Sequence, residues 1–158
     1  MRKYLVLALV CLLLLTGCGG KEVTAPHTYN DLTIQIPTNY VELTGEEFAE
    51  GMDFVFGCDP IAINGQREAK ATFEAYGLDM DLERYGNLLL KSNNVSGRLA
   101  EKDGILACSY VSGDMTYVVT MWETENAFWT VQAYCPTANY AKVKNAMVGD
   151  PEFCNCIK

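Results

Sequence analysis

The chain has 158 residues, of which 49% are hydrophobic, and its 20 acidic and 12 basic side chains give a formal net charge of −8. This length is sufficient for one domain with a substantial hydrophobic core. The acidic balance excludes nucleic acid and anionic lipid surfaces as partners bound through charge, because both repel such a chain.

The first 18 residues have the organisation of an export signal. Arg2 and Lys3 form a basic start, residues 5–15 are almost entirely apolar, and Leu15-Thr16-Gly17-Cys18 follows directly. The apolar run is about half the roughly 20 residues that a membrane-spanning helix needs, so a cleaved signal peptide is favoured. The order of leucine, two small residues and cysteine resembles the lipobox of bacterial lipoproteins. This resemblance implies that the Cys18 thiol is diacylated and that the chain is cut before it.

The lipobox divides the chain into three parts. We expect a signal peptide over residues 1–17, a lipidated tether over 18–29 and one globular domain over 30–158. Cleavage leaves 141 residues and a net charge of −10, because Arg2 and Lys3 are removed. Two acyl chains suffice for stable anchoring. The expected location is therefore the extracytoplasmic face of the cell membrane, or the outer membrane in a cell with two membranes.

The first elements of the domain are short. Residues 32–36 alternate apolar and polar side chains, as a half-buried strand does, and Pro37 ends the run. One helical turn is expected over 44–50, followed by a second strand over 52–56.

Residues 61–63 lead into Asn64-Gly65, a dipeptide that favours a tight hairpin turn. The partner strand is expected within 66–73, although residues 68–71 fit a helix equally well. A clearer helix is predicted over 81–92, with Asp79 or Asp81 as its amino-terminal cap. One face of that helix is apolar and is expected to be buried; it comprises Leu82, Tyr85 and Leu89.

Three strands in a meander are predicted to form the centre of the fold, over 104–111, 115–123 and 128–135. Both sides of these strands are apolar or aromatic, which indicates a sheet covered on both faces. A final helix is predicted over 138–148, capped by Thr137. Its buried face comprises Tyr140, Val143 and Met147.

The order of these elements resembles the PsbP-like fold, whose relatives include photosystem II extrinsic subunits, Mog-type nuclear-transport factors and bacterial lipoproteins. The residues that carry the resemblance are Pro37-Thr38-Asn39-Tyr40 after the first strand and Tyr134-Cys135-Pro136 before the closing helix. It covers residues 28–153 and implies an α+β protein in which an antiparallel sheet has helices on both faces, an α/β/α sandwich. A cystatin-like or NTF-type α+β cone is the alternative, with one long helix against one face of a curved sheet.

Five cysteines remain in the domain once Cys11 has left with the signal peptide and Cys18 carries lipid. They are Cys58, Cys108, Cys135, Cys154 and Cys156. An extracytoplasmic location permits disulfides, so we expect one or two bridges, with the pairing left open. The alternative is that Cys154 and Cys156 form a redox-active pair.

Motifs for catalysis and metal binding are lacking. The one histidine, His27, falls in the expected tether, so no histidine base is expected inside the domain. The acids Asp79, Asp81 and Glu83 suggest a calcium loop, but Arg84 stands where that loop requires glycine. We therefore predict a protein that is not an enzyme and has no metal or cofactor.

An aromatic surface offers a role in binding. Three aromatic residues on two adjacent predicted strands form a candidate partner surface: Tyr117, Trp122 and Trp129. Burial in the core is the alternative for the tryptophans. The members of the resembled family bind proteins or stabilise assemblies, and none of their functional residues matches a motif here. The sequence thus favours a membrane-anchored, non-enzymatic binding or assembly-stabilising module whose partner is an envelope protein or ligand. A thiol-active or redox-sensing lipoprotein that uses Cys154 and Cys156 is the alternative.

Overall fold

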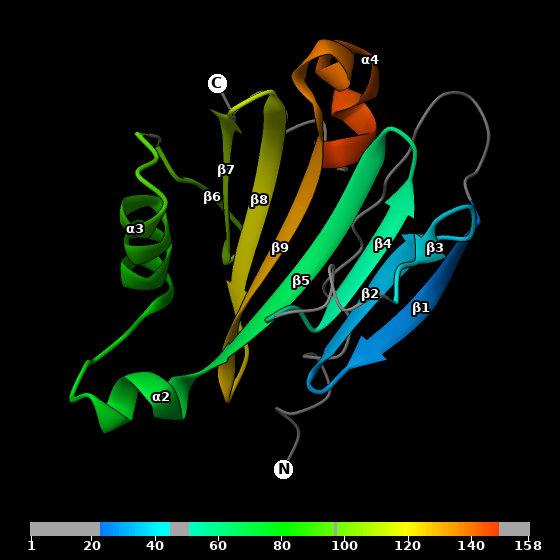
Figure 1. Cartoon of the computed structure of the whole chain (residues 1–158). Coiled ribbons are helices and arrows are strands. Elements are labelled where there is room, and N and C mark those ends of the chain that lie inside the picture. Colours follow the sequence, from blue (N-terminus) through cyan, green and yellow to red (C-terminus); the bar gives the residue numbers. More distant parts are fainter. Residues whose placement is uncertain (1–22, 45–50, 97, 149–158) are drawn as a thin grey trace.

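The computed structural model describes residues 23–44, 51–96 and 98–148 of the chain. Seven strands form one antiparallel sheet in the order β3-β4-β5-β9-β8-β7-β6, and β1 and β2 pair as a separate hairpin (Figure 1). The prediction of an α+β fold on an antiparallel sheet is confirmed. The strands are β1 (Thr24–Tyr29), β2 (Leu32–Pro37), β3 (Val41–Glu42), β4 (Phe54–Cys58), β5 (Ile61–Ala69), β6 (Ala100–Lys102), β7 (Ile105–Ser112), β8 (Met115–Glu123) and β9 (Ala127–Pro136), and the helices are α2 (Lys70–Ala75), α3 (Leu82–Ser92) and α4 (Thr137–Val148).

The predicted meander is confirmed as β7, β8 and β9, which are consecutive in the chain and adjacent in the sheet. Strand β9 then pairs with β5 on its other side, so residues far apart in sequence meet at the centre of the sheet. Between β5 and β7 the chain passes through α2, α3 and the short edge strand β6.

Each face of the sheet has its own hydrophobic cluster, because neighbouring residues of a strand point to opposite sides. In β8, Val118 and Trp122 belong to one cluster, whereas Val119 and Met121 belong to the other. All four side chains are buried. This is why the meander is apolar on both sides in the sequence.

The helices α2 and α3 cover one face. Asp81 caps α3 as predicted, since its carboxylate accepts a hydrogen bond from the Arg84 backbone N–H at 2.8 Å. The Tyr85 ring is buried and stacks on Phe128 of β9, with centroids 4.8 Å apart. Gly86 allows this close approach, because a Cβ atom there would lie 2.9 Å from Cδ1 of Leu99.

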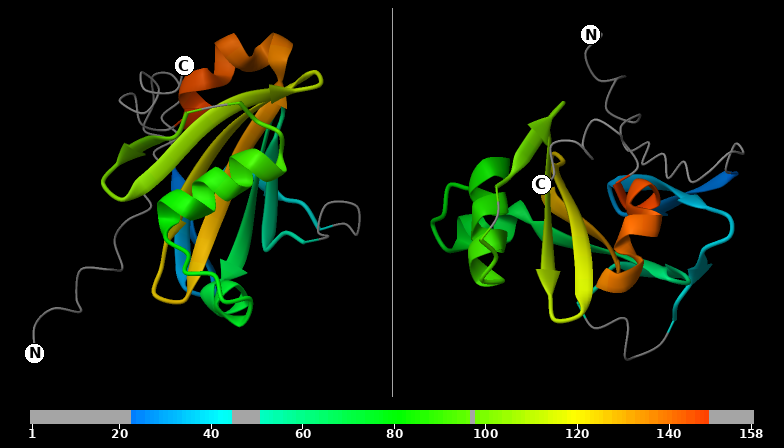
Figure 2. Two further views of the ribbon diagram at one scale, coloured as in Figure 1. Left: turned by 90° about the vertical axis from the view of Figure 1, so that its left-hand side faces the viewer. Right: turned by 90° about the horizontal axis from the view of Figure 1, so that it is seen from above.

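The β1–β2 hairpin covers the other face, and α4 packs beside it through Met147 (Figure 2). Leu32, Ile34 and Ile36 of β2 are buried against the sheet. The segment Thr24–Tyr29 was expected to belong to a tether, but it is strand β1, because pairing with β2 satisfies its backbone. The expected α/β/α sandwich differs from the structure on this face, where the covering layer includes both strands of the hairpin.

The predicted turn at Asn64-Gly65 is wrong. These residues lie inside β5, and the chain turns at Asp59-Pro60, a cis peptide bond between β4 and β5. For residues 66–73 the sequence allowed either a strand or a helix. Each prediction holds in part, because β5 continues to Ala69 and α2 begins at Lys70. The helical turn expected over 44–50 lies outside the described residues from 45 onward.

Gly65 is required inside β5 by close packing and not by turn geometry. A Cβ atom at this position would come within 2.1 Å of the Phe54 ring. That ring is stacked on Tyr29 of the hairpin, at 4.6 Å between centroids, and faces Trp129 at 6.5 Å. It therefore has little freedom to move aside.

We expect Gly65→Ala to lower the free energy of unfolding by about 1–3 kcal/mol, the typical effect of overpacking in a core. Urea denaturation followed by tryptophan fluorescence measures the change. The matched control is Gly57→Ala on β4, whose new Cβ would meet only the flexible end of Leu43 at 3.2 Å. Equal stability of the two variants would contradict the role assigned to Gly65.

Candidate functional site

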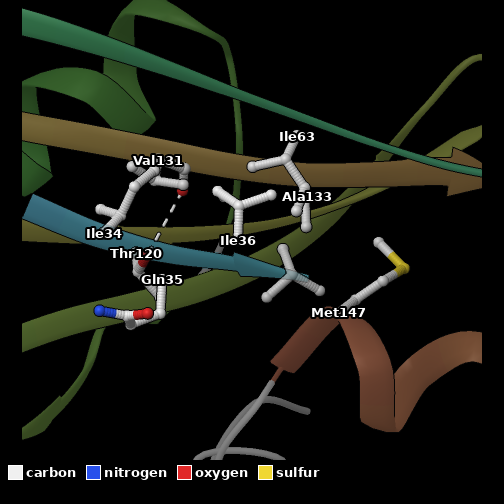
Figure 3. A pocket seen from close by; sticks show the side chains of 9 residues that line it. Ile34, Gln35, Ile36, Ile63, Thr120, Val131, Ala133 and Met147 are labelled. Carbon is white, nitrogen blue, oxygen red and sulfur yellow. Dashed lines mark hydrogen bonds between the residues drawn. The ribbon is translucent and has the colours of Figure 1, made fainter. Parts of the chain in front are cut away.

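The cavity between the hairpin and the sheet is too small to be a ligand site. Its volume is about 20 Å³, whereas pockets for small molecules have about 300–1,000 Å³. Figure 3 shows its apolar wall, to which β2, β5, β9 and α4 contribute, and the hydrogen bond from Thr120 to the Val131 carbonyl. It is a gap in the packing between the two layers.

A larger space opens at the edge of the sheet. It is a cleft of about 380 Å³ between the segment that follows α3 and the second half of β7. We call it the edge cleft. It is lined by Asn93, Asn94, Val95, Ser96, Ser109, Tyr110, Val111 and Ser112.

The end of α3 shapes one wall of the edge cleft. Asn94 adopts the left-handed conformation, with φ of 54°, and its N–H donates to the Lys91 carbonyl at 3.1 Å. The Val95 N–H donates to the Leu90 carbonyl at 2.9 Å. These two bonds form a Schellman motif, in which the apolar pair Val95 and Leu90 packs into the cluster beneath. The following polar residues are thereby held opposite β7.

The lining of the edge cleft is uncharged and mostly polar. Within the part of the chain that the structure describes, the side chains of Asn94, Ser96, Ser109 and Ser112 have no hydrogen-bond partner. Asn93 is different, because its amide donates to the Leu89 carbonyl at 2.9 Å and so belongs to the helix end. The other amide and hydroxyl groups remain able to bind a neutral polar ligand.

A row of three tyrosines begins at the edge cleft. Tyr110, Tyr117 and Tyr134 lie directly opposite one another on β7, β8 and β9. Their ring centroids are 4.9 Å and 5.5 Å apart in stacked arrangements. Burial, together with the neighbouring Tyr117, raises the pKa of both Tyr110 and Tyr134. The half-buried row thus offers ring surface and hydroxyl groups.

The partner surface predicted on Tyr117, Trp122 and Trp129 is wrong for both tryptophans. Trp122 is 7% exposed and Trp129 is fully buried, because the alternation of their strands points them toward the hairpin. Tyr117 points to the opposite face and stays half-buried. Sequence reasoning missed Tyr110 and Tyr134, which only the strand register places beside it.

Asp31 is a second group that the sequence did not single out. Its carboxylate accepts hydrogen bonds from Trp129 Nε1 at 2.9 Å, Thr124 Oγ1 at 2.5 Å and Arg67 Nε at 3.3 Å. Burial raises the pKa of Asp31, but the hydrogen bonds from Thr124, Trp129 and Arg67 outweigh it and leave the pKa below its ordinary value. The network fastens the turn of the hairpin to β5 and to the β8–β9 turn, so its role is structural.

No disulfide joins the cysteines that the structure describes, Cys58, Cys108 and Cys135. Cys108 and Cys135 are buried in the clusters on opposite faces of the sheet, so they cannot pair. Burial raises the pKa of Cys108 to about 11 and also raises that of Cys135. The expectation of one or two bridges among the five domain cysteines stays a prediction, since two of the five are not described. Cys18, Cys154 and Cys156 lie outside the described residues.

His27 lies in the folded domain and not in a tether. It belongs to β1, and its ring meets the Phe56 ring edge-on at 4.8 Å between centroids. Among the described residues, no three His, Cys, Asp or Glu side chains come close enough together to hold a metal ion. Within the same residues, no helix has the length and apolar character needed to cross a membrane.

No protein-family model matches the chain, and no curated protein is similar to it.

Loss of the Asp31 charge is expected to weaken the fold in a pH-dependent way. Because the folded pKa is lowered, the carboxylate stabilises the protein above the unfolded pKa of about 3.9, and this stabilisation is lost as the pH falls through the folded pKa. Asp31→Asn should therefore lower the free energy of unfolding by about 1.5–3 kcal/mol at pH 7, and by progressively less below about pH 4. Denaturation at several pH values measures this. Asp103→Asn, at an exposed position that tolerates both residues, is the control; a pH-independent difference for Asp31→Asn would contradict the assignment.

The described thiols should differ in reactivity. Cys58 is partly exposed and accepts a hydrogen bond from Asn39 at 3.3 Å, whereas Cys108 and Cys135 are buried. We expect a maleimide to label Cys58 at least about tenfold faster than the other two in the native protein, since attack requires access and the thiolate. Peptide mass spectrometry after timed labelling gives the rates, with unfolded protein as control. Similar rates for all three, or a bridge between Cys58 and Cys135, would contradict the structure.

Proposed function

We propose that this chain is a lipid-anchored extracytoplasmic protein whose domain binds an envelope protein or ligand and does not catalyse a reaction. The lipobox at Leu15-Thr16-Gly17-Cys18 supports the anchoring. The observation that carries the binding role is the edge cleft, whose uncharged polar side chains lack partners within the described residues.

The surroundings of the edge cleft suit recognition. The tyrosine row adjoins it through Tyr110 and offers stacked rings held in place by the central strands. Aromatic groups on a rigid scaffold are common anchors at binding interfaces, because little side-chain freedom is lost on association. The lining contains amide, hydroxyl and apolar groups but no acidic, basic or thiol group, which favours binding over acid–base or nucleophilic chemistry at this place.

The likeness to PsbP-like proteins remains part of the proposal. It rests on the order of the elements, and the antiparallel sheet with α3 before the meander and α4 after it is compatible with it. The redox alternative depends on Cys154 and Cys156, and no described feature favours it. The binding role is therefore the one that we develop.

Lipidation is tested with the full-length gene expressed in a bacterium. We expect the protein to sediment with membranes and to carry the mass of attached acyl chains, and we expect Cys18→Ala to lose both properties. Cys58→Ala is the control, because it removes a thiol without altering the lipobox. Release of wild type and Cys18→Ala into the soluble envelope fraction in equal amounts, with no acyl mass on either, would refute anchoring.

Binding is tested by site-specific photo-crosslinking in the same cells. Val111 is 61% exposed beside the edge cleft, whereas Tyr76, 80% exposed between α2 and α3, is a control site. A photo-reactive residue at position 111 should give a discrete product that position 76 does not give. Tyr110→Ala should reduce its yield about fivefold or more, since interface aromatics commonly contribute more than 1 kcal/mol. Identical products from both positions would count against the edge cleft as the binding site.

A further inference from the structure

We propose that the edge cleft receives an extended peptide segment of a partner protein. The peptide pairs with the second half of β7 as an added strand, in line with β6 along the same edge of the sheet. This inference rests on the proposed binding function and specifies its ligand. It follows from the backbone of β7, the chemistry of the opposite wall and the lack of protection at this edge.

Strand β6 pairs with only the first part of β7. Ala100, Glu101 and Lys102 lie opposite Ala107, Leu106 and Ile105, and no described residue pairs with the rest of β7 on that side. Leu99, directly before β6, is not paired with β7. Its side chain lies against Gly86 of α3 and joins the cluster beneath the helix. The packing of Leu99 against α3 thus leaves the remaining edge of β7 without a neighbouring strand among the described residues.

The free edge presents main-chain hydrogen-bonding groups. Ser112 and Met115 close a two-residue turn between β7 and β8. The two residues that close such a turn exchange main-chain hydrogen bonds. Along the strand, every second residue is bonded to the partner strand in this way, and the residues between point their N–H and C=O groups to the other side. Tyr110 therefore bonds to β8, whereas Ser109 and Val111 direct their N–H and C=O groups away from it. Ala107 supports this assignment, because it lies two residues before Ser109 and pairs with Ala100 of β6 on that same outer side.

The opposite wall complements an added strand. A peptide that pairs with Ser109 and Val111 along one side has unpaired N–H and C=O groups along its other side. Asn94 and Ser96 line the same cleft, and their amide and hydroxyl groups are donors and acceptors of the kind that such main-chain groups need. Tyr110 points to the helix side of the sheet, where side chains of the peptide that point the same way can contact the tyrosine row. The cleft has no charged lining residue, so the main chain of the peptide is the recognised feature.

This edge lacks the devices by which proteins prevent unwanted strand pairing, which are charge, proline and bulges. Ser109-Tyr110-Val111-Ser112 contains neither charge nor proline, and its register with β8 is continuous. The other edge of the sheet differs, because β3 has only two residues and one of them is Glu42. An unprotected, half-covered edge beside a cleft is typical of domains that bind peptides by strand addition.

The experiment uses the full-length chain in detergent and a display library of random linear heptapeptides. Peptides selected on the wild type are synthesised, and their affinities are measured for Ser109→Pro and Val111→Pro. Proline removes one outward N–H and is tolerated at a free edge. We expect each variant to bind about five- to tenfold more weakly, the effect of one lost main-chain hydrogen bond. Ser109→Ala, which keeps the main-chain N–H and removes only the hydroxyl, should lose less affinity than Ser109→Pro. Hydrogen exchange of the Ser109 and Val111 amides should slow on binding, with the Tyr110 amide as internal control.

Circular dichroism of the proline variants establishes that they fold. A second set of ligands, short N-acetylglucosamine oligomers, separates this inference from the proposed function. Sugar binding in the cleft that is unaffected by Ser109→Pro would refute the peptide while leaving the binding role intact. Binding of a synthetic copy of residues 150–158, or dimerisation through this edge, would refute a separate partner. No selected peptide, no sugar binding and no crosslink at position 111 would overturn both proposals.

Discussion

The fold depends on how the carboxylate of Asp31 fastens the β1–β2 hairpin to the sheet. Its acceptor oxygens join three separate elements, because Arg67 lies on β5, Thr124 follows β8 and Trp129 lies on β9. Trp129 is fully buried, and its indole N–H has this carboxylate as its acceptor. A buried donor without an acceptor costs about 1–3 kcal/mol, so the tryptophan and the aspartate require each other.

The hairpin held in this way closes the larger of the two cores. Tyr29 of the hairpin stacks on Phe54, which in turn faces Trp129. These ring contacts add to the attachment that Asp31 provides. Gly65 makes the position of Phe54 possible, because no side chain competes for the space under the ring. The apolar face of the sheet would otherwise meet water at Ile63, Val118 and Val131.

The opposite face is closed differently, and the difference creates the edge cleft. Helix α3 lies close to the sheet at Gly86 and ends in a motif that turns Asn94 outward. Leu99 then draws the chain inward before β6 begins, so β6 is short and the second half of β7 stays accessible from the side. The packing of Leu99 is thus the same feature that leaves the second half of β7 without a neighbouring strand among the described residues.

Local patterns in the sequence were sufficient for the meander, for α3 with its Asp81 cap and for the burial of Met147 on α4, because alternation, helical period and capping act between residues close in the chain. They failed where distant residues decide. Asn64-Gly65 has the composition of a turn, but Phe54 needs the glycine within a strand, and Thr24–Tyr29 becomes a strand because β2 supplies its partner. The sequence shows only that Tyr117, Trp122 and Trp129 are all aromatic. The direction of each side chain decides their fate: the tryptophans lie in the core, and Tyr117 lies in the row with Tyr110 and Tyr134. The edge cleft was likewise beyond prediction, since its lining comes from two segments that only the packing of α3 on the sheet brings together.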